Sequence, residues 1–219
     1  GVVLVEDPVT MFEAALLLSK VKKVRSTGVA AALQSGGACT LFAEAAGAAG
    51  LELPEFSAST KRTLAKVLPH FASQNNPLDV TGQAAVETDM YEGALEALAN
   101  DPAVGLIAFD AFPPRLEGET PWADPVLEKV KELRRRTGVS FASVAMSPLA
   151  YIPSAKAFTR RHTLPFLQGH HAATGAIKAL MEFQGSRGRA TVDDLPAHPN
   201  RAKALRALKG HVGPIDEET

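Results

Sequence analysis

The sequence has few of the residues that define several large classes of protein. A single cysteine, Cys39, stands among 219 residues, which excludes an intrachain disulfide framework and a cysteine-rich zinc site. No apolar run approaches the ~20 residues that a membrane-spanning helix needs. The formal net charge is only −1, so no charge excess points to nucleic acid or to an anionic membrane. No basic leader precedes an apolar core, and these absences together favour a cytoplasmic protein.

The motifs by which many enzymes hold nucleotides or metals are also missing. The chain has neither the G-x-G-x-x-G spacing of a dinucleotide fold nor the Gly-Lys-Ser/Thr end of a P-loop. His170 and His171 are adjacent and lack the i, i+4 spacing of two ligands on one helical face, so we expect no metal site. A histidine at such a helix start is more typical of a capping or surface residue than of a catalytic group.

Apolar runs alternate with segments of helical periodicity along most of the chain. Gly28–Leu33 and Val104–Asp110 are continuous apolar runs, which is typical of strands covered on both faces. The predicted fold class is therefore α/β: one doubly wound, mostly parallel sheet with helices on both faces, over residues 1–185. Residues 186–219 are rich in Gly, Arg, Asp and Pro at their start and are predicted to be a linker.

The first segments carry two more specific expectations. Val2–Val5 is a short β-branched run that would begin the alternation of strands and helices. Pro8 opens an amphipathic helix to about Val24. Its predicted apolar face consists of Phe12, Ala15, Leu16, Leu18 and Ser19.

The most informative stretch is 28–41, where a buried strand stops at Gln34, turns through Ser35-Gly36-Gly37 and restarts as an Ala-rich helix. Free N–H groups at a helix start carry partial positive charge and can hold a phosphate or a carboxylate. On these residues alone, anion binding and a merely tight strand–helix turn are equally good interpretations. Cys39 lies at this helix start, where a thiolate pKa can fall, although a small buried hydrophobe is the commoner role.

A second polar turn follows the short strand at 76–80, in the string Asn-Pro-Leu-Asp-Val-Thr-Gly-Gln. Its Asp79 is more typical of a loop organiser than of a catalytic base. Asp110 ends the strongest predicted strand, where it would either face the crevice or cap a loop. Ligands in such folds bind beyond the carboxyl ends of the strands, so we expect the two glycine turns to converge on one crevice.

These strings, in their order along the chain, resemble the ADP-forming acyl-CoA synthetases, the acetyl-CoA and succinyl-CoA synthetase-like ligases. The likeness covers nearly all of residues 1–185. It is to the second succinyl-CoA-ligase-like, flavodoxin-type domain, and is greatest to the fused feruloyl-CoA-synthetase-like members. The ordered set is specific, whereas each piece alone is not. The pieces are Gly-Val-Val-Leu-Val-Glu-Asp at 1–7, the Ser-Gly-Gly turn, Gly47–Pro54, Leu68-Pro69, Asn75–Gly82, and Leu-Pro-Phe with Ala-Ile-Lys-Ala-Leu at 164–180.

The resemblance implies a ligase that converts a carboxylic acid, CoA and ATP to acyl-CoA, ADP and phosphate. ATP phosphorylates a histidine, the phosphoryl group passes to the carboxylate, and the CoA thiol displaces phosphate. The phosphohistidine is cradled by two helix N-termini, and the helix after Ser35 matches one of them. The implied phosphate-binding residues are Gln34, Ser35, Gly36, Gly37, Ala38, Gly82 and Gln83, with Asp79, Thr81 and Asp110 as further pocket residues. No catalytic residue and no metal ligand is expected in this chain.

The chain also departs from the family pattern. It lacks a CoA-binding domain, a domain with the phosphorylated histidine in a Ser-His-Thr-Gly-Ala-type string, and an ATP-grasp domain, towards which 211–219 would lead. We therefore expect CoA, ATP and Mg to be bound mainly by other domains of the same synthetase, with a homodimer possible and no activity from this chain alone. The alternative is a non-catalytic regulatory module of a fused protein acetyltransferase, which would hold an anion or a CoA phosphate as effector. A flavodoxin-like electron carrier is disfavoured, because few aromatics are present at 111–125 to sandwich FMN.

Overall fold

The computed structural model describes residues 2–111, 124–147, 153–186, 200–207 and 209. The chain divides into two compact units, Gly1–Ser186 and Arg187–Thr219. In the second unit the structure describes the helix α8 (Arg201–Ala207). The predicted loop at 111–125 with Trp122, the linker at 186–199 and the segment 211–219 lie almost entirely outside the described residues.

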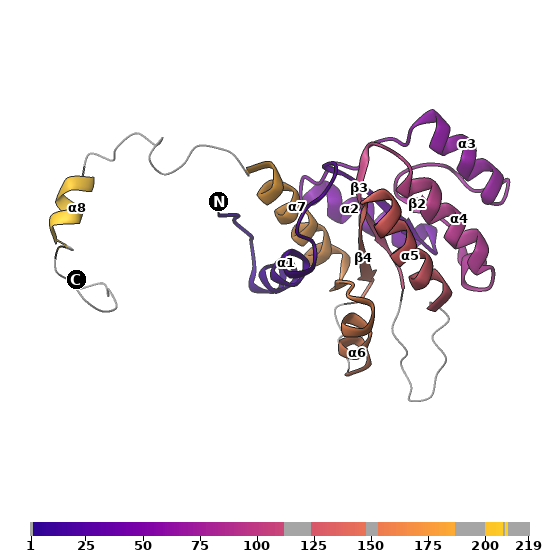
Figure 1. The fold of residues 1–219 in the computed structure, drawn as a ribbon. Helices are drawn as coiled ribbons and strands as arrows, with labels where there is room; N and C mark the ends of the chain where they lie inside the picture. The colour runs from indigo at the N-terminus through magenta and orange to yellow at the C-terminus, as the bar shows by residue number, and fades with distance from the viewer. Residues whose placement is uncertain (1, 112–123, 148–152, 187–199, 208, 210–219) are drawn as a thin grey trace. The chain divides into compact units, whose positions relative to one another are not determined.

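The first unit is built on one parallel sheet, as Figure 1 shows. The five strands lie side by side in the order β2-β1-β3-β4-β5, and every neighbouring pair is parallel. Because each chain crossing from one parallel strand to the next contains a helix, the predicted doubly wound α/β class is confirmed. The strands are β1 (Gly28–Leu33), β2 (Leu78–Asp79), β3 (Val104–Phe109), β4 (Ser140–Ala145) and β5 (Phe166–Gln168).

Helices cover both faces of this sheet. One apolar cluster joins the sheet to α3, α4 and α5, and a second joins its other face to α1, α2 and α7. Side chains alternate along β1: Ala30 and Ala32 belong to the first cluster, while Val29, Ala31 and Leu33 belong to the second. None of the described helices is both long and apolar enough to cross a membrane. The helices are α1 (Pro8–Lys20), α2 (Gly36–Ala48), α3 (Ala58–Val67), the 3-10 turn η1 (Gly82–Ala85), α4 (Thr88–Ala99), α5 (Asp124–Thr137), α6 (Pro153–His162) and α7 (His170–Ser186).

Helix α1 buries a face that only partly overlaps the predicted one. The predicted Phe12 is 69% exposed, and Ala15 and Ser19 are exposed as well, whereas Leu16 and Leu18 are half-buried and pack against the second cluster. The fully buried side chains are Thr10, Glu13, Ala14 and Leu17. Thr10 lies so close to Gly175 of α7 that a Cβ at Gly175 would come within 2.7 Å of the Thr10 methyl group. Because apolar residues surround α1 on several sides, close packing against α7 decided its orientation, and periodicity did not.

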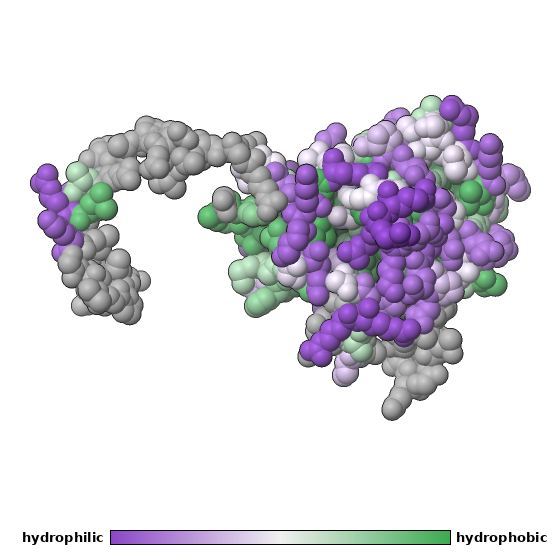
Figure 2. Space-filling view, viewed as in Figure 1, coloured by the Kyte–Doolittle hydropathy of each residue, from purple (hydrophilic) through white to green (hydrophobic). Residues whose placement is uncertain are grey.

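The run Val2–Val5 forms no strand. Val3 and Val5 pack against the second cluster, while Val2 and Leu4 are almost fully exposed. With the exposed side chains of α1 they form an apolar surface beside that helix, visible in Figure 2. The expected strand at 2–5 is therefore absent. Its side chains still alternate between the core and solvent, but its backbone does not pair with a strand of the sheet.

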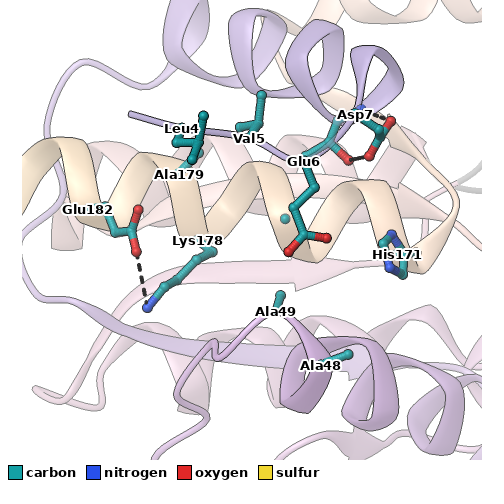
Figure 3. Close-up of a pocket in the computed structure, with 12 residues that line it drawn as sticks. Leu4, Val5, Glu6, Asp7, Ala48, Ala49, His171, Lys178, Ala179 and Glu182 are labelled. Carbon is teal, nitrogen blue, oxygen red and sulfur yellow. Dashed lines mark hydrogen bonds and ion pairs between the residues drawn. The ribbon is translucent and has the colours of Figure 1, made fainter. Parts of the chain in front are cut away.

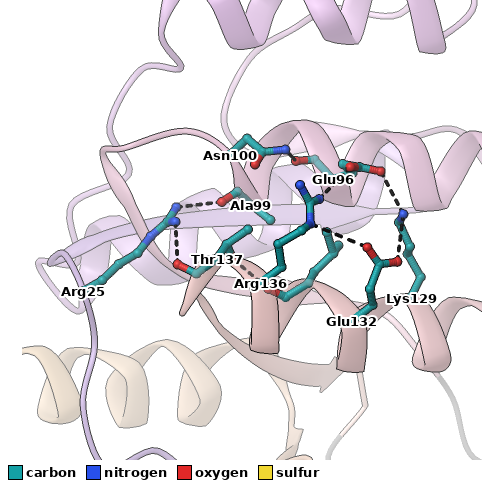
Figure 4. A network of polar contacts seen from close by, with 9 residues as sticks. Arg25, Glu96, Ala99, Asn100, Lys129, Glu132, Arg136 and Thr137 are labelled. Carbon is teal, nitrogen blue, oxygen red and sulfur yellow. Dashed lines mark hydrogen bonds and ion pairs between the residues drawn. The ribbon is translucent and has the colours of Figure 1, made fainter.

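Arg25 closes the amino end of the sheet, the end at which the strands begin. Its guanidinium donates to the carbonyl oxygens of Val104 at 2.7 Å, Ala99 at 2.8 Å, Asp101 at 2.7 Å and Thr137 at 3.1 Å. Figure 4 shows this group between the ends of α4 and α5. Carbonyls at a helix end have no partner within the helix, and one planar cation satisfies several of them here.

Candidate functional site

The start of α2 presents unpaired backbone donors at the carboxyl end of β1. Ser35 is the N-cap, and its hydroxyl oxygen accepts a bond from the Ala38 amide at 3.1 Å. Ser35, Gly36 and Gly37 are exposed, and the amides of the two glycines have no acceptor among the described residues. The helix begins at Gly36, so both glycines belong to its first turn rather than to the preceding turn, as the sequence suggested. Two adjacent N–H groups therefore face solvent where the helix dipole is positive.

Asp110, at the end of β3, holds one side of this turn. Its Oδ2 accepts from the Gln34 amide at 3.0 Å, and the Tyr91 hydroxyl lies 2.8 Å from its Oδ1. Burial raises the pKa of Asp110, while the bonds from Gln34 and Tyr91 oppose that shift. Burial also raises the pKa of the Tyr91 phenol well above its ordinary value, so the hydroxyl keeps its proton and can donate. Asp110 thus faces the turn, whereas Gln34 is directed at Asp110 rather than at solvent.

Asp79 holds the other side of the same turn. Its Oδ1 accepts from the Thr81 amide at 2.8 Å, and its Oδ2 would lie 3.2 Å from a Cβ placed on Gly36. Leu33 and Asp79 are paired across β1 and β2, so the two strands end together. A side chain at position 36 would therefore have to displace the Asp79 carboxylate slightly, and the two predicted glycine turns do meet at one edge of the sheet.

The residues after Asp79 make local bonds. Thr81 has a left-handed backbone with φ +66°, and its hydroxyl accepts from the Gln83 amide at 3.3 Å. Gln83 donates its side-chain amide to Glu87 at 2.7 Å. Gly82 and Gln83 are exposed. The Gln83 side chain is therefore directed towards Glu87 at the start of α4, and its backbone amide towards Thr81.

Cys39 is buried one turn into α2, and burial raises the pKa of its thiol to about 12, with smaller contributions from the nearby charges of Asp79 and Asp110. Of the two roles that the sequence left open, the lowered thiolate pKa is therefore wrong, and the commoner role as a small buried hydrophobe is confirmed. Desolvation outweighs the helix dipole here, so Cys39 acts as a small apolar side chain. Among the described residues, no three His, Cys, Asp or Glu side chains gather as a metal site.

The sequence reasoning missed a buried polar group at the edge of the sheet. Glu13 of α1 is 6% exposed, and its Oε1 lies 3.5 Å from Nε2 of Gln168 at the end of β5. Burial raises the pKa of Glu13 to about 7. Buried Oε2 of Glu13, Oε1 of Gln168 and Nδ1 of His170 have no hydrogen-bond partner within the described part of the chain. A glutamate within an otherwise apolar helix was the available sequence signal.

His170 and His171 occupy different surroundings at the start of α7. His170 is buried and packs edge-on against Phe42 of α2, with ring centroids 5.6 Å apart, so a packing role replaces the predicted capping or surface role. His171 is exposed and lines a cavity of about 190 Å³ between α7, the end of α2 and residues 4–7, shown in Figure 3. In that cavity Lys178 pairs with Glu182 at 3.4 Å and donates to the Gly50 carbonyl at 3.0 Å. Neither histidine lies in the turn around Gly36.

No protein-family model matches the chain. Over 107 residues, 49% of its length, it is 31% identical to an acetate–CoA ligase (ADP-forming) I of Archaeoglobus fulgidus. The fold matches PH0766 from Pyrococcus horikoshii OT3 with a TM-score of 0.68 and 23% identity, covering 84% of this chain and 41% of that one. It also matches a dinucleotide-forming acetyl-coenzyme A synthetase 1 of Ca. Korarchaeum cryptofilum, solved in complex with phosphate and ADP. There the TM-score is 0.63 and the identity 18%, covering 85% of this chain and 40% of that one.

The chain spans 15% of the length of the curated ligase and about 40% of the solved chains. At the identities found, the solved structures show a shared fold. The sequence match, in turn, is to a ligase that forms ADP, the reaction class implied by the ordered motifs. Likeness in sequence over half the chain and in fold over most of it confirms the inferred resemblance: the chain resembles a domain of the ADP-forming acyl-CoA synthetases.

Proposed function

We propose that this chain is one domain of an ADP-forming acyl-CoA synthetase, which joins a carboxylic acid to CoA at the expense of ATP. Its sequence likeness to an ADP-forming acetate–CoA ligase and the order of its motifs support this assignment. Other domains of the same enzyme supply the phosphorylated histidine, the CoA site and the ATP/Mg site. A homodimer stays a prediction. Residues 1–185 form the synthetase domain in this proposal, and 186–219 form the linker towards the next domain.

The first turn of α2 is proposed to hold the phosphoryl group while it is carried on that histidine. The observation that carries the proposal is the pair of exposed amides of Gly36 and Gly37, which have no acceptor among the described residues. A phosphoryl group bears two negative charges, and donors fixed before it arrives stabilise it without reorganising. The Ser35 hydroxyl lies at the same place and can donate its hydrogen while its oxygen caps the helix.

The neighbouring residues are proposed to position this turn. The amides of Ala38 and Gln34 already donate to Ser35 and Asp110, so they fix the loop rather than bind the anion. Asp110 accepts bonds on both oxygens, which fixes its carboxyl group beside the turn. Asp79 holds Thr81 on one oxygen and limits the size of residue 36 with the other. Thr81, Gly82 and Gln83 would form the far wall.

Two substitutions on α2 test the proposal. Gly37→Leu places a bulky side chain at the phosphate position, and Gly47→Leu makes the same change near the other end of the helix. Both glycines are exposed, and a Cβ at either position meets nothing within 4 Å. Both variants should therefore fold and gain helix propensity. The chain would be joined with the phosphohistidine, CoA-binding and ATP-grasp domains, and histidine phosphorylation from labelled ATP would be measured.

We expect Gly37→Leu to lower phosphohistidine formation at least about tenfold, the effect of losing one or more preorganised donors, while Gly47→Leu leaves it unchanged. Equal activity of both variants would refute the assigned role. If phosphate still shifts the amide resonances of Gly36 and Gly37 in the separate chain while phosphohistidine formation ignores Gly37→Leu, the regulatory module of an acetyltransferase becomes the better assignment.

A further inference from the structure

A second concave site lies at the amino end of the sheet, opposite the start of α2. It is a hollow of about 460 Å³ between the end of α1 and the segment from the end of α5 to the start of β4. The two sides are joined where the Ser140 hydroxyl lies 3.5 Å from the Lys23 carbonyl. Among the described residues, no acidic side chain lines this basic hollow, and its six cationic lining residues are Lys20, Lys22, Lys23, Lys131, Arg134 and Arg135.

The charged side chains on the α4 side of α5 and those around the basic hollow differ in their ion pairing. On the flank towards α4, Lys129 pairs with Glu96 at 2.8 Å and Glu132 at 3.1 Å. Arg136 pairs with the same two glutamates, and Figure 4 shows the closed network. Around the basic hollow, within the described part of the chain, Lys20, Lys23, Arg134 and Arg135 join no ion pair. Lys131, which also lines it, pairs with Glu128 at 2.8 Å. Carboxylates therefore neutralise only part of the positive charge of the basic hollow.

Helix ends account for only part of this charge. The Lys22 ammonium lies 3.5 Å from the Leu18 carbonyl, and Arg134 lies 3.4 Å from the Thr163 carbonyl. The ends of α1 and α5 each carry about half a negative charge, or roughly one elementary charge together. The four cations that join no ion pair exceed that amount about fourfold, so this end of the sheet is locally positive in a chain whose net charge is −1. Such a surface attracts anions from solution.

We propose that the basic hollow binds a small polyanion with linked phosphate groups, as in a di- or triphosphate. The site is concave, of ligand size, and lined by cations from two sides, so it concentrates positive potential in a small volume. Linked phosphates place three or more charges within that volume, whereas an acidic protein surface offers one charge per side chain. The guanidinium groups of Arg134 and Arg135 suit phosphate oxygens geometrically. This site is separate from the proposed phosphoryl cradle and does not depend on it.

Inorganic tripolyphosphate is the probe, titrated into this chain by calorimetry at about 50 mM and about 300 mM salt. We expect micromolar binding at low salt that weakens at least about tenfold at high salt, because exposed charges are screened. The double variant Lys23→Glu/Arg135→Glu should lose at least tenfold in affinity. Both side chains are exposed, so the variant should keep the fold.

The matched control is Arg62→Glu/Lys66→Glu on α3, which makes the same charge change at two other exposed residues. If binding depends on the charge at the basic hollow rather than on the net charge of the chain, this control should retain tripolyphosphate affinity within about twofold. Three results would overturn the proposal: no binding at low salt, equal losses in both double variants, or tighter binding of hexaglutamate than of tripolyphosphate. The last result would assign the basic hollow to an acidic protein surface instead.

Discussion

The two ends of the parallel sheet obtain positive charge from different sources. At the carboxyl end, helix α2 begins, and its positive charge comes from backbone amides such as those of Gly36 and Gly37. At the amino end, helices α1, α4 and α5 finish, and their carbonyls are met by cationic side chains such as Arg25 and Lys22. Positive potential at the carboxyl end therefore comes from backbone dipoles held in place by the helix, whereas at the amino end it comes from flexible side chains that water and salt screen.

Replacing one glycine by alanine at each end of the sheet should have opposite effects on stability, and this is the largest difference that we expect. A Cβ at Gly105, near the start of β3, would overlap the backbone of Ser26, including its carbonyl oxygen. We expect Gly105→Ala to destabilise the fold by at least about 3 kcal/mol, because neither backbone segment can move freely. Gly37→Ala, which meets open space, should stabilise it by about 0.5–1 kcal/mol. Urea unfolding measures both, and a cost below about 1 kcal/mol for Gly105→Ala would show that the amino end is not rigid.

The buried Glu13 makes stability fall with rising pH. Folding raises its pKa from 4.5 to about 7, so the folded state binds this proton more tightly. Its contribution is fully present below pH 4.5 and is lost as pH rises through 7, a total of about 3 kcal/mol. Glu13→Gln should remove this slope between pH 5 and 8 in urea unfolding, whereas Glu44→Gln on the exposed side of α2 should retain it. A parallel slope in both variants would mean that Glu13 is not the source.

Removing the amino-end cation tests how far one side chain closes that end. Arg25→Met leaves four carbonyls without their charged donor and should destabilise the fold by about 2 kcal/mol. Arg25→Lys should recover only part of this loss, because an ammonium cannot reproduce the planar fork. The exposed Arg62→Met provides the control. Thermal unfolding that is the same for Arg25→Lys and the wild type would show that charge alone matters.

The smallest expected effect concerns the support of the carboxyl-end turn. Tyr91→Phe removes the hydroxyl beside Asp110 Oδ1 and should cost about 1 kcal/mol. Because Asp110 also accepts from the Gln34 amide, we expect hydrogen exchange at Gln34 to speed up while exchange at Leu95, on the same helix, changes little. If exchange at the Gln34 amide were as slow in Tyr91→Phe as in the wild type, Asp110 would hold the turn without help from Tyr91.

Local sequence was sufficient to predict features that depend on a single short segment. The two continuous apolar runs form the buried strands β1 and β3, as predicted. The predicted polar turn after β1 is also present, with Ser35 as the N-cap, although Gly36 and Gly37 already belong to α2. In each case a short string of consecutive residues carried the signal.

Other features depended on a partner from a distant part of the chain. The orientation of α1 depends on Gly175, and the burial of Glu13 depends on Gln168. Periodicity in α1 could not select its face, because apolar residues occur around much of the helix. Cys39 likewise has the neighbourhood of a helix start in sequence, and only its burial shows which effect on the pKa prevails.

By itself, then, the sequence determined the α/β alternation, the parallel sheet and the helix start after Ser35 at the end of β1. The reason is that continuous apolar runs indicate strands buried on both faces, and the Ser-Gly-Gly string indicates a helix start, each within a few consecutive residues. The tertiary structure alone decided that Asp79 and Asp110 flank that helix start from two neighbouring strands. It also decided that six cations from two distant segments line one hollow, because residues so far apart meet only when the sheet is assembled.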